Sequence, residues 1–258
     1  MQLLRSLLIF MAITLALPLS KASAVAFPNE TLNYKVLYKW GLIHKQAGRA
    51  TLVLRNSGRQ YHATLYARSE AWADKFYKLR DTLKTTMRMN DLSPVIYERI
   101  AHEDGKFAHD IVKFSRSGNT YSAECTRYRR GKKSSNTNVS TTSLQAQGFA
   151  VDMVSSFYYL RSLDFNTMKS GATKTVNIFS GKRKELLNIT YHGTQSIKLD
   201  DRKYETFKIT FTFTSEGKKK TSEPIEAWLS TDYPHIPLKL IGKLKIGQIQ
   251  CIYVPQNK

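Results

Sequence analysis

The chain has 258 residues, with 40 Lys and Arg against 20 Asp and Glu, a formal net charge of +20 and a sequence pI of about 9.9. Its length allows one or two domains with an apolar core. A content of 41% hydrophobic and 11% aromatic residues excludes a chain that is disordered throughout. Two cysteines are too few for a disulfide-rich scaffold or a four-cysteine zinc site.

The first 24 residues have the three parts of a secretory signal peptide. A basic start ends at Arg5, an apolar run covers residues 7–17, and the small residues at 22–24 supply a cleavage site. The run is shorter than the roughly 20 apolar residues of a membrane-spanning helix. We therefore expect a signal peptide over 1–24, cleaved near Ala24, and an exported chain that is periplasmic or extracellular. No cysteine lies near the cleavage site, so a lipoprotein is not expected.

Export would place Cys125 and Cys251 in an oxidising compartment, where a disulfide between them would persist. Closing such a long loop would stabilise the fold by about 4–5 kcal/mol in the chain-entropy model. Both cysteines also lie at apolar positions of alternating, strand-like segments, which is typical of buried free thiols. The sequence therefore leaves two alternatives open, a disulfide between the two cysteines and a pair of buried free thiols.

Apolar and polar residues alternate along most of the chain after residue 30, which predicts β-strands. Short turn signals separate the strands, so we expect antiparallel neighbours. The predicted strands cover residues 32–38, 50–55, 61–67, 83–89, 95–100, 111–115, 121–126, 175–179, 185–191, 207–214, 226–230, 237–241 and 244–254. The fold class that this pattern predicts is mainly β, with one or more curved antiparallel sheets in a half-barrel or barrel-like arrangement.

One principal α-helix is predicted over residues 152–162, with Asp152 as its N-cap. A shorter helical turn is predicted over 69–79, with Trp72 and Phe76 on one side. A helix that lies on a sheet needs an apolar stripe. The aromatic residues of both segments are therefore expected to pack into the core.

Residues 132–148 are rich in Ser, Thr, Asn and Gln and are expected to form a polar loop or linker. They divide the chain into an N-terminal antiparallel β half, 25–131, and a second half, 149–258, that holds the helix and the C-terminal strands. The pattern leaves open whether the two halves are one continuous domain.

No catalytic motif is present: the sequence lacks a nucleophile elbow, a phosphate loop and a zinc-protease helix. We therefore expect a non-enzymatic protein with no cofactor and no metal. His102, Asp104 and His109 are the one cluster of metal-type ligands. Asp104-Gly105 is also a strong hairpin turn with polar flanks. We expect the turn, and a metal-dependent enzyme is the remaining alternative.

The clearest charge feature is a basic run over residues 127–133. It contains Arg127, Arg129, Arg130, Lys132 and Lys133, with Tyr128 among them. Basic runs with interleaved aromatic residues bind polyanions by phosphate contact and stacking. Export makes an anionic envelope lipid or polysaccharide the expected partner, and no specific nucleic acid is expected. Lysines at solvated hairpin tips also protect sheet edges from aggregation, which is the alternative explanation.

Several short phrases occur in an order that resembles a known family. They are the segment at 34–54 with its A-G-x-A turn, Phe-Tyr-Lys-Leu-Arg-Asp at 76–81, Leu-Ser-Pro at 92–94, Tyr-Glu-Arg at 97–99, the helix phrase at 156–164, Ala-Trp-Leu-Ser-Thr-Asp at 227–232 and Ile-Pro-Leu at 236–238. Together they resemble the domain-of-unknown-function 3108 family of exported bacterial proteins. The resemblance implies an exported, largely strand-built protein, and it implies no catalytic residues, since the family has no agreed activity.

Two function classes follow from these expectations. The first is an exported cell-envelope protein that acts as a non-enzymatic binding or assembly module, with an apolar or lipid-like ligand as one candidate. The alternative is a polyanion-binding surface protein that uses the basic run at 127–133. The sequence leaves the oligomeric state open.

Overall fold

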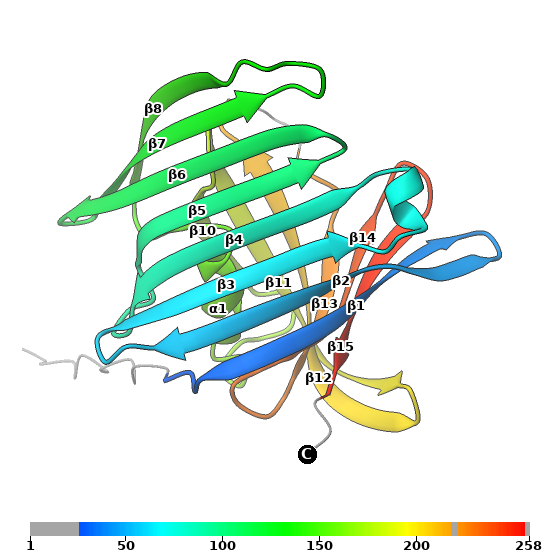
Figure 1. Cartoon of the computed structure of the whole chain (residues 1–258). Helices are drawn as coiled ribbons and strands as arrows, with labels where there is room; N and C mark the ends of the chain where they lie inside the picture. Colours follow the sequence, from blue (N-terminus) through cyan, green and yellow to red (C-terminus); the bar gives the residue numbers. More distant parts are fainter. Residues whose placement is uncertain (1–25, 218–220, 256–258) are drawn as a thin grey trace, which may run out of the picture.

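Fifteen strands of the described residues form one sheet, in the order β8-β7-β6-β5-β4-β3-β2-β1-β15-β14-β13-β12-β11-β10-β9 (Figure 1). The computed structural model describes residues 26–217 and 221–255, so the signal peptide expected at 1–24 lies outside the described residues. The first strands are β1 (Glu30–Trp40), β2 (Ile43–Asn56), β3 (Gln60–Ser69), β4 (Leu79–Arg88), β5 (Pro94–Glu103), β6 (Lys106–Ser117), β7 (Thr120–Arg130) and β8 (Asn138–Gln147). The later strands are β9 (Ala150–Val151), β10 (Thr173–Phe179), β11 (Lys184–Leu199), β12 (Arg202–Ser215), β13 (Ile225–Ser230), β14 (Pro237–Lys243) and β15 (Gln248–Val254).

The sheet is an antiparallel meander that joins the two halves of the chain. Strand β1 pairs with β2 on one side and with the last strand, β15, on the other. Among the described strands, only the short β9 pairs in parallel, with β10. The predicted mainly β, curved antiparallel fold is confirmed, and one sheet runs through both halves.

The inner face of the sheet holds the core, with the helix α1 (Ser155–Arg161) between the two halves (Figure 1). One cluster of buried residues comes mainly from β1 to β8, with Ala150 of β9 and Phe179 of β10, and includes Tyr158 of α1. A second cluster comes from β9 to β13 and includes Leu160 of the same helix. One helix therefore packs against strands from both halves. No helix in the described part of the chain, α1 included, is long and apolar enough to cross a membrane.

The helix begins at Ser155, three residues after its expected start. Asp152 accepts hydrogen bonds at Oδ1 from the backbone N–H groups of Val154 (2.7 Å) and Ser155 (2.8 Å). Its side chain thus closes a turn at 152–154 that precedes the helix, as an Asx turn does.

The polar loop or linker expected over 132–148 requires a correction. Residues 138–147 form the edge strand β8, which pairs with β7 from Asn138 to Gln147. An edge strand has one free side, so it forms on backbone hydrogen bonds with few buried side chains. Only Ala146 of β8 is buried, which explains why its composition resembles that of a loop.

The helical turn expected over 69–79 is reduced to a short 3₁₀ turn, Ala73–Lys75. Phe76 is 80% exposed, so the prediction that its side chain packs in the core is wrong. Polar contacts hold this β3–β4 loop in place of apolar burial, as described below.

The possible disulfide does not form in the structure. Cys125 of β7 and Cys251 of β15 are free thiols. Burial raises the pKa of each thiol to about 11, and at Cys125 the nearby Asp110 carboxylate adds to the rise. At neutral pH both are therefore unreactive, protonated thiols.

Candidate functional site on the inner face of the sheet

Strand pairing aligns the inward side chains of β2 to β7 in rows that cross the sheet. One row contains Leu52, Leu65, Leu83, Arg99, Asp110 and Arg127. The row changes from apolar to charged between Leu83 and Arg99, which are direct cross-strand neighbours. The inner face therefore has an apolar part and a charged part side by side.

The adjacent row is made mostly of small residues. It contains Ala50, Ala67, Asp81, Ala101, Ala108 and Arg129. Four of these six residues are alanines. Because their methyl groups are small, the long charged side chains of the two rows can extend over them and contact one another. Both rows lie toward the end of the sheet that carries the β1–β2, β3–β4 and β5–β6 turns, which we call the tip end.

Six residues, Asp81, Arg99, Glu103, Asp110, Arg127 and Arg129, make up a charge cluster on this face. Asp110 is 2% exposed and is its centre. Its Oδ1 atom accepts hydrogen bonds from Arg129 Nη2 at 2.5 Å and from Arg127 Nε at 3.1 Å. Its Oδ2 atom lies 3.9 Å from Arg99 Nη1. A single buried carboxylate thus holds three guanidinium groups.

Asp81 is the second buried carboxyl of the charge cluster. Its Oδ2 atom accepts a hydrogen bond from Arg99 Nη2 at 3.2 Å, and Arg99 also binds Glu103. Its Oδ1 atom is buried and has no hydrogen-bond partner among the described residues. Burial raises the pKa of Asp81 to about 6, while Arg99 opposes the rise and Glu103 adds to it. The carboxyl therefore changes protonation near pH 6 and has one buried oxygen that no described residue binds.

The arginines at the edge of the charge cluster remain accessible. The side chains of Arg127 and Arg129 are 23% and 32% exposed. A guanidinium has five N–H donors, so an arginine bound to Asp110 keeps donors for a second anion. The planar group fits carboxylate and phosphate oxygens in pairs. On the same face, Leu65 and Leu83 are partly exposed.

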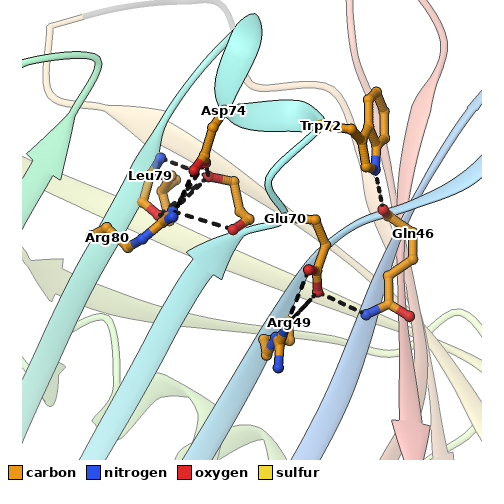
Figure 2. Close-up of polar contacts among 8 residues, drawn as sticks. Gln46, Arg49, Glu70, Trp72, Asp74, Leu79 and Arg80 are labelled. Carbon is orange, nitrogen blue, oxygen red and sulfur yellow. Dashed lines mark hydrogen bonds and ion pairs between the residues drawn. The ribbon is translucent and has the colours of Figure 1, made fainter.

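A network of ion pairs attaches the β3–β4 loop to the tip end (Figure 2). Arg80 donates to Asp74 Oδ2 at 2.7 Å, and Ser69 bonds both residues. Arg49 of β2 donates to both oxygens of Glu70, at 3.1 and 3.0 Å. These contacts fix the loop although its aromatic side chains are exposed.

Two further contacts connect the β3–β4 loop with its surroundings. Trp72 Nε1 donates to the carbonyl of Gln46 at 2.6 Å (Figure 2). The hydroxyl of Tyr77 donates to Glu103 Oε2 at 2.9 Å, so the loop also touches the charge cluster.

The neighbouring residues Arg80 and Asp81 have separate partners. Arg80 pairs with Asp74, whereas Asp81 pairs with Arg99. Adjacent side chains of a strand point to opposite faces, which accounts for the separate partners.

The basic run at 127–133 is divided by the same alternation. Arg127 and Arg129 bind Asp110 on the inner face. Arg130 lies over the ring of Phe107, 5.4 Å from its centroid. Lys132 pairs with Asp104 at 3.1 Å, and Lys133 is exposed. The run does not form one continuous surface, and its binding of a polyanion stays a prediction.

The metal-type residues near the β5–β6 turn are not brought together. His109 Nε2 lies 2.9 Å from Glu98 Oε1, and the His102 ring lies beside Phe107. Asp104 and Gly105 have positive φ angles of 47° and 78°, which confirms the predicted hairpin turn. Within 26–217 and 221–255, no three His, Cys, Asp or Glu side chains are placed to hold one metal ion.

Sequence reasoning missed Asp81, Arg99 and Asp110 as site residues. A signal was present, because each carries a charge at an inward position of its strand. Arg99 lies between the buried Tyr97 and Ala101, and Asp110 lies two residues before the buried Val112. A charged residue at a strand position that otherwise holds apolar residues marks a buried or functional group.

Comparison with known proteins gives a family and a fold. The model of the family described as "Protein of unknown function (DUF3108)" matches residues 33–251. No curated protein sequence matches the chain. A crystal structure of a "Beta-barrel-like Protein of Domain of Unknown Function DUF1849 from Brucella abortus" is similar, with a TM-score of 0.61 and 12% identity over 90% of this chain and 98% of that one. That likeness supports the barrel-like fold alone. By the extent of the family match, the chain belongs to the DUF3108 family.

Proposed function

We propose that the chain is an exported, non-enzymatic binding module of the cell envelope, whose inner face takes an anionic, lipid-like molecule. The observation that carries this proposal is the boundary between Leu83 and Arg99, where the apolar and charged parts of the inner face meet. Export rests on the predicted signal peptide at 1–24. The non-enzymatic character rests on a charge cluster whose carboxylates and guanidinium groups bind one another and leave no activated nucleophile.

The charged part of the inner face supplies the head-group contacts in this proposal. Arg127 and Arg129 retain exposed guanidinium donors. A hydrogen bond to a charged group contributes about 1.5–3 kcal/mol. The apolar part, with Leu65 and Leu83, covers the tail, at about 0.8 kcal/mol for each methylene removed from water.

Protonation of Asp81 should regulate the affinity for an anion. With Asp81, Glu103 and Asp110 all ionised, the three carboxylates balance the three arginines. Because the pKa of Asp81 is raised to about 6, a proton on it leaves the charge cluster with a net positive charge below that pH. The anionic ligand should therefore bind more tightly at pH 5 than at pH 8, and the effect should be absent in Asp81→Asn.

The experiment is a fluorescence titration of the purified mature protein with a dansyl-labelled fatty acid. Ala67→Phe places a ring on the inner face, between Ala50 and Asp81 of the small-residue row. Thr64→Phe, the matched control, places the same ring on the outer face of the same strand. We expect Ala67→Phe to bind about tenfold more weakly or worse, which is a loss of about 1.4 kcal/mol, and Thr64→Phe to bind like the parent. Equal affinity in all three proteins would refute the inner-face site.

One observation favours a second candidate, a polyanion-binding surface. A Cβ added to Gly181, in the β10–β11 turn, would lie 3.8 Å from Arg127 Nε, so the basic residues at 182–184 directly follow a residue that lies beside Arg127. Retention on heparin should then fall steeply with salt. Replacing Arg130, Lys133 and Arg183 with Ser should abolish the specific part of that retention. Unchanged retention would eliminate this surface.

A further inference from the structure

Three loops at the tip end present apolar side chains to solvent. The exposed residues are Trp40, Leu42 and Ile43 of the β1–β2 turn, Phe76 of the β3–β4 loop, and Leu244 and Ile246 of the β14–β15 turn. Leu42 is fully exposed, and Phe76 is 80% exposed. We call these six residues the tip patch. Large apolar side chains gathered at one end of a molecule mark an interaction surface.

Contacts between the loops hold the tip patch in a fixed arrangement. The hydroxyl of Tyr38 donates to the carbonyl of Ile246 at 3.2 Å, which joins the β1–β2 and β14–β15 turns. Gly247 has a φ of 76° and lies so close to β1 that an added Cβ would be 3.0 Å from the Cβ of Trp40. Lys45 lies over the ring of Trp72 in the β3–β4 loop, 4.8 Å from its centroid.

Two of the three loops of the tip patch, the β1–β2 and β14–β15 turns, have basic surroundings. Lys39, Lys45, Lys243 and Lys245 flank the two turns, and neither 39–45 nor 243–247 contains a carboxylate. The ion pairs among the described residues include none of these four lysines. The charges of Lys39, Lys243 and Lys245 therefore remain available to an external anion, and Lys45 lies over the Trp72 ring.

We infer that the tip patch docks the protein on the surface of an anionic lipid bilayer. The apolar side chains enter the interface between head groups and acyl chains, while the lysines contact anionic head groups. Lysine is depleted in protein–protein interfaces, whereas long basic side chains around apolar tips are suited to a lipid interface. The charge complementarity thus favours a membrane over a protein partner.

The membrane contact does not depend on ligand binding at the inner face. It uses turns and the strand ends beside them, and the inner-face site uses rows further into the sheet. If both hold, docking places the charge cluster at the end of the sheet that faces the bilayer.

The test is co-sedimentation of the purified mature protein with vesicles. One set contains phosphatidylcholine alone, and the other contains phosphatidylcholine and phosphatidylglycerol in equal parts. The test variant is Leu42→Ser with Ile246→Ser, which removes two exposed side chains from two turns. The matched control is Ile96→Ser, an exposed apolar residue near the opposite end of the sheet. A second variant replaces Lys39, Lys45, Lys243 and Lys245 with Gln.

We expect the parent and Ile96→Ser to sediment with the anionic vesicles and to stay in solution with phosphatidylcholine alone. The double Ser variant and the Gln variant should each bind the anionic vesicles about tenfold more weakly, and both should keep the parent's affinity for the dansyl fatty acid. Absence of parent binding to the anionic vesicles at low salt would overturn the inference. Equal vesicle binding by the parent and the double Ser variant would overturn it as well.

Discussion

Arg161 of α1 and Glu30 of β1 form an ion pair that is buried inside the sheet. The Arg161 side chain is 0% exposed, and its Nη2 atom lies 2.9 Å from Glu30 Oε2. Its Nε atom donates to the carbonyl of Pro234 at 3.0 Å, and its guanidinium lies over the ring of Phe27. Arg161 thus uses its Nε, Nη1 and Nη2 atoms in hydrogen bonds, and it ties the helix to the first strand and to the β13–β14 loop.

Removing one partner of this pair should be costly. Arg161→Met leaves Glu30 as an unpaired buried charge, and we expect a loss of about 3–5 kcal/mol in the free energy of unfolding. The double variant Arg161→Met with Glu30→Met should recover most of that loss. Urea denaturation measures both. Arg49→Met, which breaks the exposed pair with Glu70, is the control and should cost about 1 kcal/mol or less. A double variant as unstable as the single one would contradict this account.

The hydrogen bond between Thr85 and Asp152 joins β4 to the turn before α1. Thr85 Oγ1 donates to Asp152 Oδ2 at 2.6 Å, and both residues are buried. Thr85→Val removes the donor and leaves a buried acceptor, so the free energy of unfolding should fall by about 1–3 kcal/mol. Thr82→Val, on the outer face of the same strand, should change it by about 0.5 kcal/mol or less. Similar denaturation midpoints for the two variants would count against a structural role for the bond.

Protonated Asp81 should add to the free energy of unfolding, and this contribution should weaken as the pH rises. Burial raises its pKa in the folded state to about 6, above the ordinary value of 3.8. The folded protein then holds the proton more tightly than the unfolded chain. The stabilising contribution is complete below pH of about 4 and is lost as the pH rises through about 6.

Asp81→Asn isolates this contribution. We compare the free energy of unfolding of the variant with that of the parent. The difference, variant minus parent, should rise by about 2–3 kcal/mol between pH 4 and pH 7. Urea denaturation at a series of pH values provides the measurement. A difference that does not change with pH would show that Asp81 has an ordinary pKa.

Gly247 should be required for the close contact of the β14–β15 turn with β1. Its positive φ disfavours other residues, and an added Cβ would overlap the carbonyl oxygen of Lys39. Gly217 has a similar φ of 73° but open space around it. Gly217→Ala should cost about 1 kcal/mol, and Gly247→Ala should cost more, because the overlap adds to the backbone strain. Equal thermal midpoints for the two variants would show that the turn can move away from β1.

Local patterns predicted most of the fold. Alternation of apolar and polar residues gave the strands because each strand has one buried and one wet face, and the spacing of apolar residues gave the helix. The pattern failed at β8, whose edge position needs few buried side chains, so its polar composition resembles a loop. It also failed at Phe76, because ion pairs from Arg49 and Arg80 hold that loop in place of a buried aromatic side chain.

The candidate site depends on register, which local patterns do not contain. Asp81 and Arg99 of the site are 18 residues apart, and the buried pair Glu30 and Arg161 outside the site is separated by 131 residues. Only the pairing of β4 with β5, and the return of α1 to β1, brings these charges together. The basic run at 127–133 was visible in the sequence, but the destination of Arg127 and Arg129 on the inner face was not.

Native mass spectrometry of the protein purified from its own host tests the central proposal, an inner face that binds an anionic, lipid-like molecule, most directly. The parent and Thr64→Phe should each carry a bound molecule that organic solvent extracts and that has one acidic head group and an apolar tail. Ala67→Phe should appear without it. A parent that is consistently free of ligand, or an Ala67→Phe variant with the same occupancy as the parent, would contradict the proposal.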